Sequence, residues 1–263
     1  GSEIQWLAAL ARADVPVPAP IPTPDGRMIV TLPDGTGSRR ATLLDWVTGS
    51  PMGASQQPLT ITGDRRRLVF ENLGRAMAAL HDASDRWSVP STFRRPAWDR
   101  DALVGDRPFW GRFWEVAPGS GTASALLDLR DRIRRALDRA GPLDYGLIHA
   151  DLVRENVLID GDRLHFIDFD DAGFGWRMFD IATALLPNLQ ELDCSQLCRS
   201  LVTGYHSRRP VPAAELALLP VFLVARALTY VGWSAARPEL DPTGQRLKRH
   251  IDRALDLARQ WQE

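Results

Sequence analysis

The segment from residue 146 to residue 173 constrains the fold of this chain more than any other part. It reads GLIHADLVRENVLIDGDRLHFIDFDDAG. Two apolar, β-prone runs, at 157–160 and 163–167, flank an Asp-Gly-Asp turn, and this pattern predicts a β-hairpin. Opposed positions of paired strands lie roughly 5 Å apart. We therefore expect the hairpin to bring Asn156, at its entry, close to Asp168, at its exit.

Polar side chains at the open end of this hairpin predict phosphoryl-transfer chemistry. Amide and carboxylate oxygens suit Mg²⁺, which also takes water and substrate phosphates as ligands. Phosphoryl transfer requires these metal ligands and a carboxylate that orients and deprotonates the acceptor hydroxyl. We assign Asp151, in the loop before the hairpin, as the base, Asn156 and Asp168 as metal ligands, and His149 as a buried scaffold of the loop. The alternative is a solvated, aspartate-rich loop, which the combined spacing of the three polar residues disfavours.

The rest of the chain predicts an α+β protein, with a small sheet followed by a mostly helical region. Four prolines between residues 16 and 22 impose an extended crossing, because proline removes a donor and biases its predecessor away from helix. Thr62 or Asp64 can cap the long helix that follows the sheet. The expected elements are helices at 3–12, 64–82 and 122–140, a C-terminal helix with Leu247, Ile251 and Leu255 on one face, and strands near 27–32 and 40–46 joined by a turn at 33–37.

Composition excludes several classes of function. The 263 residues carry a net charge of -1, which gives no electrostatic footprint for a nucleic acid polymer. No apolar run reaches the roughly 18 to 20 residues that a membrane helix requires. We expect no signal peptide and a cytoplasmic protein. The sequence leaves the oligomeric state open.

Three motifs resemble those of a known family. They are His149-Ala150-Asp151, followed by Asn156, then Ile167-Asp168-Phe169-Asp170, and Asp180-Ile181-Ala182. Together they resemble the aminoglycoside phosphotransferase and choline kinase group, which includes type II homoserine-kinase-like enzymes. That group reads His-Gly-Asp in the catalytic loop, so Ala150 is a mild departure. The resemblance implies a protein-kinase-like fold in which Asp180 supports the catalytic loop.

The resemblance also implies an ATP- or GTP-dependent, Mg²⁺-dependent kinase whose acceptor is a hydroxyl of a small polar molecule. The hinge that contacts the nucleotide base would fall at Asp45, Trp46 and Val47, and Glu3 would be the glutamate that pairs with a strand lysine. Further candidates for the acceptor site rest on residue type alone. Asp170 and Asp171 could bind a cationic acceptor or cap a turn, and Trp176 and Trp233 could line its pocket or pack in the core.

Two parts of the family pattern are missing from the sequence: the glycine-containing hairpin over the phosphates and the strand lysine. The one lysine, Lys248, lies near the C-terminus. We expect residues 1–48 to be the remnant of a small β-containing lobe with the hinge, and 49–263 to be the helical catalytic lobe. The sequence is then either a piece of a longer protein or a shortened relative.

Two other functions compete with a small-molecule kinase. The first is a kinase-like module that binds ligand without turnover, which the single lysine favours. The second is a protein-serine kinase, which we disfavour because no segment resembles Asp-Phe-Gly followed by Ala-Pro-Glu.

Overall fold

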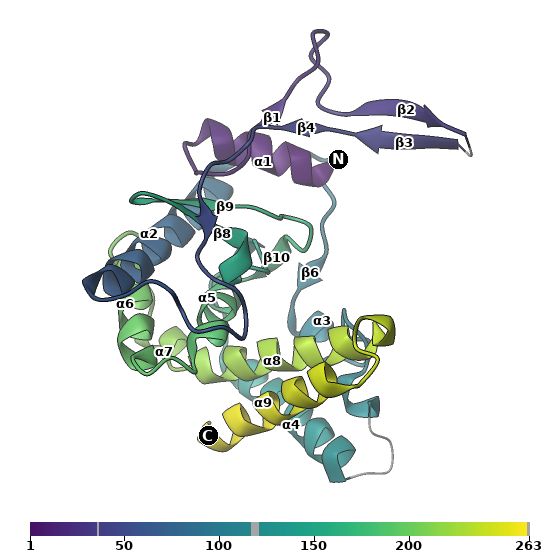
Figure 1. Ribbon diagram of the computed structural model, residues 1–263. Coiled ribbons are helices and arrows are strands. Elements are labelled where there is room, and N and C mark those ends of the chain that lie inside the picture. Colours follow the sequence, from purple (N-terminus) through teal and green to yellow (C-terminus); the bar gives the residue numbers. More distant parts are fainter. Residues whose placement is uncertain (36, 117–120, 262–263) are drawn as a thin grey trace. The chain divides into compact units, whose positions relative to one another are not determined.

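The computed structural model describes residues 1–35, 37–116 and 121–261 (Figure 1). Contacts between backbone segments divide the chain into two compact units. Unit 1 contains residues 1–96, 151–172 and 187–210, and unit 2 contains residues 97–150, 173–186 and 211–263. Helices and small, mostly antiparallel sheets make up both units, which confirms the predicted α+β class. The predicted lobe boundary after residue 48 stays a prediction.

Unit 1 combines three helices with short strands. Helix α1 bears the apolar face that the sequence predicts, since Ile4, Leu7 and Leu10 are buried, and so is Trp6. The elements of this unit are α1 (Ser2–Arg12), β1 (Pro20–Ile21), β2 (Val30–Asp34), β3 (Gly37–Ala41), β4 (Leu43–Leu44), β5 (Ser50–Pro51), α2 (Asp64–Arg86), η2 (Arg154–Asn156), β8 (Val157–Asp160), β9 (Arg163–Phe166) and α6 (Cys194–His206).

Helices α2 and α6 cross in direct backbone contact. A Cβ atom added to Gly74 would lie 2.0 Å from the Leu201 carbonyl oxygen, and one added to Gly204 would lie 1.9 Å from that of Glu71. Only glycine at both positions allows this approach. The predicted stripe of α2 is confirmed, because Leu73, Met77 and Leu80 are all buried.

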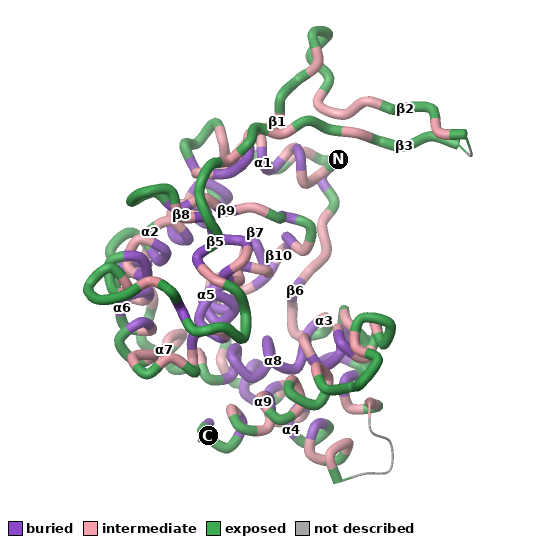
Figure 2. The backbone as a smooth tube through the Cα atoms, in the orientation of Figure 1, coloured by how far each residue is buried: buried purple, intermediate pink, exposed green. Residues whose placement is uncertain are grey.

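Two predictions about the first part of the chain are wrong in detail. Neither Thr62 nor Asp64 caps α2, whose N-cap is Gly63 without a side-chain hydrogen bond. The first hairpin is tighter than expected, because Pro33 belongs to β2 and pairs with Ser38 of β3. Proline is tolerated there because an exposed edge strand does not require its missing N–H. Figure 2 shows β2 and β3 exposed along most of their length.

The predicted strand at 40–46 is also divided. Strand β3 ends at Ala41, and the separate strand β4 pairs with β1, so that Leu43 lies opposite Ile21 and Leu44 opposite Pro20. The proline-rich crossing therefore contributes a strand of its own. Asp45 and Trp46 lie beyond β4, in the segment that leads to β5.

Unit 2 is built around α8, which is apolar on all sides and buried along most of its length (Figure 2). The sheet in this unit has the order β6-β10-β7. The elements are β6 (Ala97–Trp98), α3 (Arg100–Val104), η1 (Phe113–Glu115), α4 (Gly121–Arg139), β7 (Tyr145–Ile148), β10 (Gly173–Trp176), α5 (Arg177–Leu185), α7 (Ala213–Leu216), α8 (Leu219–Ala235), η4 (Pro238–Leu240) and α9 (Gln245–Gln260), with η3 (Leu186–Asn188) at the junction between units.

The two amphipathic helices predicted in this unit are present. In α4 the expected stripe of Leu126, Leu129, Ile133 and Leu137 is buried. In α9 the expected stripe is only half-buried, and the buried residues of the helix are the alanines Ala254 and Ala258. None of the described helices has the length and apolarity that crossing a bilayer requires.

Candidate active site

The predicted hairpin is confirmed, and its open end holds two of the candidate metal ligands. Strands β8 and β9 pair from Val157 opposite Phe166 to Asp160 opposite Arg163. One step further, the Ile167 N–H donates to the Asn156 carbonyl oxygen at 3.0 Å. Asp168 follows Ile167 directly, so the backbone brings Asn156 and Asp168 to the same end of the hairpin, as the sequence predicts.

Asn156 also contacts the candidate base. Its side-chain amide nitrogen donates to both the carbonyl oxygen and Oδ2 of Asp151, each at 2.9 Å. Asn156 is buried, Asp151 is half-buried and Asp168 is exposed. The donation fixes the orientation of the Asn156 amide, so that its oxygen is the atom that could bind a cation. The three residues on which the sequence prediction depends therefore belong to one hairpin mouth within unit 1.

Two oxygen ligands from the protein fit Mg²⁺ better than a metal that requires a complete protein cage. Among the described residues, no three His, Cys, Asp or Glu side chains gather in a metal-binding arrangement. Mg²⁺ commonly binds through one or two carboxylates, with substrate phosphates and water completing its octahedron. The Asn156 amide oxygen and the Asp168 carboxylate fit that pattern.

The loop before Asp151 is held by a buried carboxylate in unit 2. The N–H groups of His149 and Ala150 donate to Oδ2 and Oδ1 of Asp180, at 2.9 and 2.7 Å. His149, Ala150 and Asp180 are all fully buried. Asp180 lies in the first turn of α5, where the helix dipole favours a negative charge. Ala150 has a φ of 66°, in the left-handed region where the related family has glycine.

The turn after Asp168 is anchored on α1. The Ala172 N–H donates to the Phe169 carbonyl oxygen at 3.1 Å and closes the turn. The Phe169 ring meets the buried Trp6 ring edge to face, with centroids 5.3 Å apart. Trp6 in turn donates its indole N–H to Ser84 Oγ at 3.1 Å. Aromatic packing therefore joins the candidate metal loop to the first helix.

Glu3 lies on α1, close to this turn. Burial raises the pKa of the Glu3 carboxyl, the nearby Asp170 charge raises it further, and Arg95 opposes both. Its acidic neighbour is therefore Asp170, and its cationic neighbour is an arginine rather than a lysine. The role of Glu3 in nucleotide binding stays a prediction.

The predicted hinge residues lie between β4 and β5. The Asp45 N–H donates to the Ala19 carbonyl oxygen at 2.9 Å. Trp46 is 93% exposed, which is unusual for such a large apolar side chain. Beyond Val47, Thr48 Oγ1 donates to Asp160 Oδ2 at 2.6 Å, which ties this segment to the hairpin.

The two tryptophans proposed for an acceptor pocket both lie in unit 2. Trp176 makes edge-to-face contacts with Tyr145 and Phe222, with centroids 6.0 and 5.6 Å apart. Trp233 lies under the guanidinium of Arg237, at 4.7 Å from the ring centroid. Core and cation–π packing account for these contacts, and an acceptor role stays a prediction.

Sequence reasoning missed a buried arginine inside the catalytic segment. Arg154 is 1% exposed and donates to Asn188 Oδ1 at 2.9 Å and to Glu191 Oε1 at 2.8 Å. It also donates to the main-chain oxygen of Gln57. Glu191 receives a second arginine, Arg66, at 2.8 Å. The one sequence signal for this network is the position of Arg154 between two polar site residues.

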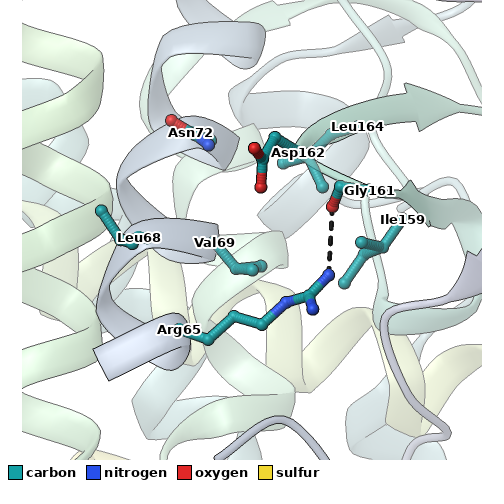
Figure 3. Close-up of a pocket in the computed structure, with 8 residues that line it drawn as sticks. All are labelled: Arg65, Leu68, Val69, Asn72, Ile159, Gly161, Asp162 and Leu164. Atoms are coloured by element: carbon teal, nitrogen blue, oxygen red, sulfur yellow. Dashed lines mark hydrogen bonds between the residues drawn. The ribbon is translucent and has the colours of Figure 1, made fainter. Parts of the chain in front are cut away.

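A pocket of about 240 Å³ lies at the other end of the hairpin (Figure 3). Its lining includes Arg65 and Val69 of α2, and Gly161 and Asp162 of the hairpin turn. Arg65 donates to the Gly161 carbonyl oxygen at 3.1 Å. A four-residue strand spans roughly 13 Å, so this pocket is separate from the mouth where Asn156 and Asp168 meet.

Comparison with known proteins identifies the fold and the family. The fold is protein-kinase-like: a microcompartment-associated aminopropanol kinase of known structure superposes with a TM-score of 0.78 at 35% identity, covering 97% of this chain and 78% of that chain. The sequence model of the phosphotransferase enzyme family matches residues 1–216. The chain belongs to this family, as its motifs predict.

Other relatives are also kinases named for small molecules. The structure of an amicoumacin kinase, hAmiN, in complex with AMP-PNP, Ca²⁺ and Ami has the same fold, with a TM-score of 0.76 at 20% identity over 97% of this chain and 76% of that chain. The homoserine kinase of Sinorhizobium medicae (strain WSM419) is 30% identical over 231 residues, which are 84% of this chain and 63% of that protein. This chain therefore spans less than two thirds of the homoserine kinase.

Proposed function

We propose that this protein is a small-molecule kinase that transfers the γ-phosphoryl group of ATP or GTP to a hydroxyl group. The acceptor is a small polar molecule such as an aminoglycoside, an amino alcohol or a homoserine-like amino acid. One observation carries the proposal: the Asn156 amide bonds to Asp151 at the mouth of a hairpin whose second strand leads into Asp168. Membership of the phosphotransferase enzyme family supports it.

Each residue of the hairpin mouth has a chemical role in this proposal. Asp151 accepts the proton of the acceptor hydroxyl, and Asn156 holds the Asp151 carboxylate in place through its amide N–H. The Asn156 oxygen and the Asp168 carboxylate hold Mg²⁺, which when bound offsets the charge on the nucleotide phosphates. Asp180 fixes the main chain before Asp151, beside the buried His149.

The remaining predicted contacts are part of the same proposal. The Asp45 N–H already donates to Ala19, so contact with the nucleotide base falls mainly to Trp46 and Val47. Glu3, on α1 beside Asp170, is the further candidate for nucleotide binding. Asp170 and Asp171, together with the tryptophans Trp176 and Trp233, are the candidates for acceptor recognition.

Thermal unfolding and ADP release test the proposal. A ligand at about 100 times its dissociation constant adds about 2.7 kcal/mol to the free energy of unfolding, so Mg²⁺ with ATP or GTP should raise the melting temperature by several degrees. Asp168→Asn should abolish the metal-dependent part of this shift. Asp151→Asn should keep the shift but lower ADP release in the presence of an acceptor by about 10² to 10⁴.

Asp162→Asn is the matched control, because Asp162 is an exposed aspartate in the turn of the same hairpin. It should leave both measurements unchanged. The kinase proposal fails if Asp151→Asn releases ADP as fast as this control, across a panel of hydroxyl acceptors on which the unmodified chain is active.

A second candidate is a module that binds nucleotide without turnover. Lys248, the one lysine of the sequence, is 75% exposed on α9 and pairs with Asp252 at 2.6 Å, so it is not a candidate for the family's strand lysine, and binding has to be tested apart from turnover. A metal-dependent nucleotide shift without ADP release for any acceptor would establish this alternative.

A further inference from the structure

One arginine binds most of the main-chain oxygens that follow Asp168. The Arg95 guanidinium donates through Nη2 to the Phe169 carbonyl oxygen at 2.7 Å and to that of Asp170. Its Nε donates to the carbonyl oxygen of Ala172. Three of the four peptide oxygens at 169–172 therefore bind one side chain. Arg95 comes from the connection between α2 and β6, far from the turn in sequence.

The shape of the guanidinium suits this task. Arginine presents five N–H donors in a rigid, planar fork, whereas lysine presents a single ammonium group on a flexible stem. The rigid fork fixes the relative positions of three carbonyl oxygens better than the three rotatable N–H donors of an ammonium group. On another side of the turn, Phe169 packs against Trp6. The turn is therefore held both by its main chain and by its one large apolar side chain.

Charge is a second reason for an arginine at this position. Burial lowers the pKa of the half-buried Arg95, and the charges of Glu3, Asp170 and Asp171 act in the opposite direction. Arg95 is therefore a positive charge placed among the carboxylates of Glu3, Asp170 and Asp171, beside the turn that carries Asp168.

Asp168 is the residue whose direction this turn determines. Its φ of 63° is in the left-handed region, which is uncommon for a residue other than glycine. The Asp170 N–H approaches Asp168 Oδ1 at 3.4 Å, so the position of the carboxylate is linked to the turn. A shift of the carbonyls at 169–172 would therefore move the Asp168 carboxylate at the mouth of the hairpin.

We propose that Arg95 is a positioning residue that holds the turn at 168–172 so that Asp168 can share a divalent cation with Asn156. The inference rests on the proposed function, because it assumes the cation. In this role Arg95 acts through the main-chain oxygens that it binds and not on the cation or the substrate.

Binding of Mn²⁺ in the presence of ATP, followed by electron paramagnetic resonance, tests this role on the full chain. Arg95→Met should weaken Mn²⁺ binding by about tenfold or more, and millimolar guanidinium chloride should restore part of the affinity. Arg95→Lys keeps the charge but loses the fork, so it should still bind Mn²⁺ several-fold more weakly than the unmodified chain. Arg95→Lys also keeps the test valid if Arg95→Met does not fold.

Arg94→Met is the matched control. Arg94 is the adjacent exposed arginine, and its guanidinium donates to the main-chain oxygens of Ser91 and Phe93. This variant should bind Mn²⁺ like the unmodified chain. The inference is overturned if Arg95→Lys, or a folded Arg95→Met, binds Mn²⁺ as tightly as Arg94→Met. Failure of the proposed function gives a different result from failure of the Arg95 inference. In that case the unmodified chain binds no Mn²⁺, or Asp168→Asn binds Mn²⁺ and ATP as tightly as the unmodified chain.

Discussion

Replacing Arg154 with methionine should destabilise the protein strongly, although methionine preserves much of the apolar stem. The side chain is 1% exposed, and its guanidinium joins η2 to Asn188, Glu191 and the main chain at Gln57. Methionine supplies none of these donors. The buried Asn188 and the largely buried Glu191 side chain would then lose their charged partner.

The expected loss in the free energy of unfolding depends on the partners that Glu191 keeps in the variant. Removing one partner of a buried ion pair typically costs about 3–5 kcal/mol. Here Glu191 keeps Arg66 at 2.8 Å and the Leu59 N–H at 2.9 Å, so its charge stays partly balanced. We therefore expect a loss near the lower end of that range, about 3 kcal/mol.

Urea unfolding at neutral pH measures this loss as a lower midpoint at an unchanged slope. Arg67→Met is the control, since Arg67 is 49% exposed and pairs with Glu71 at 3.4 Å; exposed pairs contribute at most about 1 kcal/mol. The double variant Arg154→Met with Glu191→Gln should lose less than the sum of the two single losses. A loss below about 1 kcal/mol for Arg154→Met, or additive losses, would refute the reasoning.

Three further predictions concern the fold and the loop. Gly204→Ala should cost more than about 3 kcal/mol in urea unfolding, because the new Cβ would lie 1.9 Å from a backbone oxygen. Burial acts to raise the pKa of Glu191, but hydrogen bonds from Arg66, the Leu59 N–H and Arg154 lower it below 4.5. The contribution of ionised Glu191 to the free energy of unfolding is therefore complete above about pH 4.5 and is lost as the pH falls through the pKa of the folded state. Glu191→Gln should consequently reduce the fall in stability that the protein shows at acid pH. Ala150→Gly should change the free energy of unfolding by less than about 1 kcal/mol, because relief of the left-handed φ offsets the lost methyl burial and the greater chain entropy of glycine, whereas Ala150→Val should be clearly destabilising.

The parts of the fold that the sequence predicts are those encoded by local pattern. The hairpin around Gly161 is predicted because an Asp-Gly turn between β-prone runs leaves few alternatives. The buried stripe of α4 is predicted because its leucines and Ile133 recur at helical spacing. The meeting of Asn156 with Asp168 follows from the same hairpin, because strand pairing determines which residues share an end.

The parts that it does not predict depend on long-range contacts with the main chain. Arg95 binds main-chain carbonyl oxygens, which every residue has, so no partner residue type marks its contacts in sequence. Arg154 binds the side chains of Asn188 and Glu191, which lie more than 30 residues further along the chain, so no local pattern marks them as its partners. Arginine is also usually exposed, and nothing local distinguishes these two from the many arginines on the surface. The tighter first hairpin escaped prediction for a related reason, since Pro33 is a turn signal until the exposure of its strand is known.

Both segments that carry the site residues contain one strained residue beside a charged side chain that binds the main chain. Ala150 and Asp168 have φ values of 66° and 63°, a conformation that costs roughly 1–2 kcal/mol for a residue with a Cβ. Such strain persists only where the surroundings fix the backbone. At Ala150 the Asp180 carboxylate accepts two N–H groups, and after Asp168 the Arg95 guanidinium donates to three carbonyl oxygens. Charge-assisted bonds to peptide groups constrain φ and ψ directly. Asp180 therefore fixes the main chain directly before the proposed base, and Arg95 fixes the main chain directly after one proposed metal ligand. The two N–H groups held by Asp180 explain how the loop can carry alanine where the family has glycine.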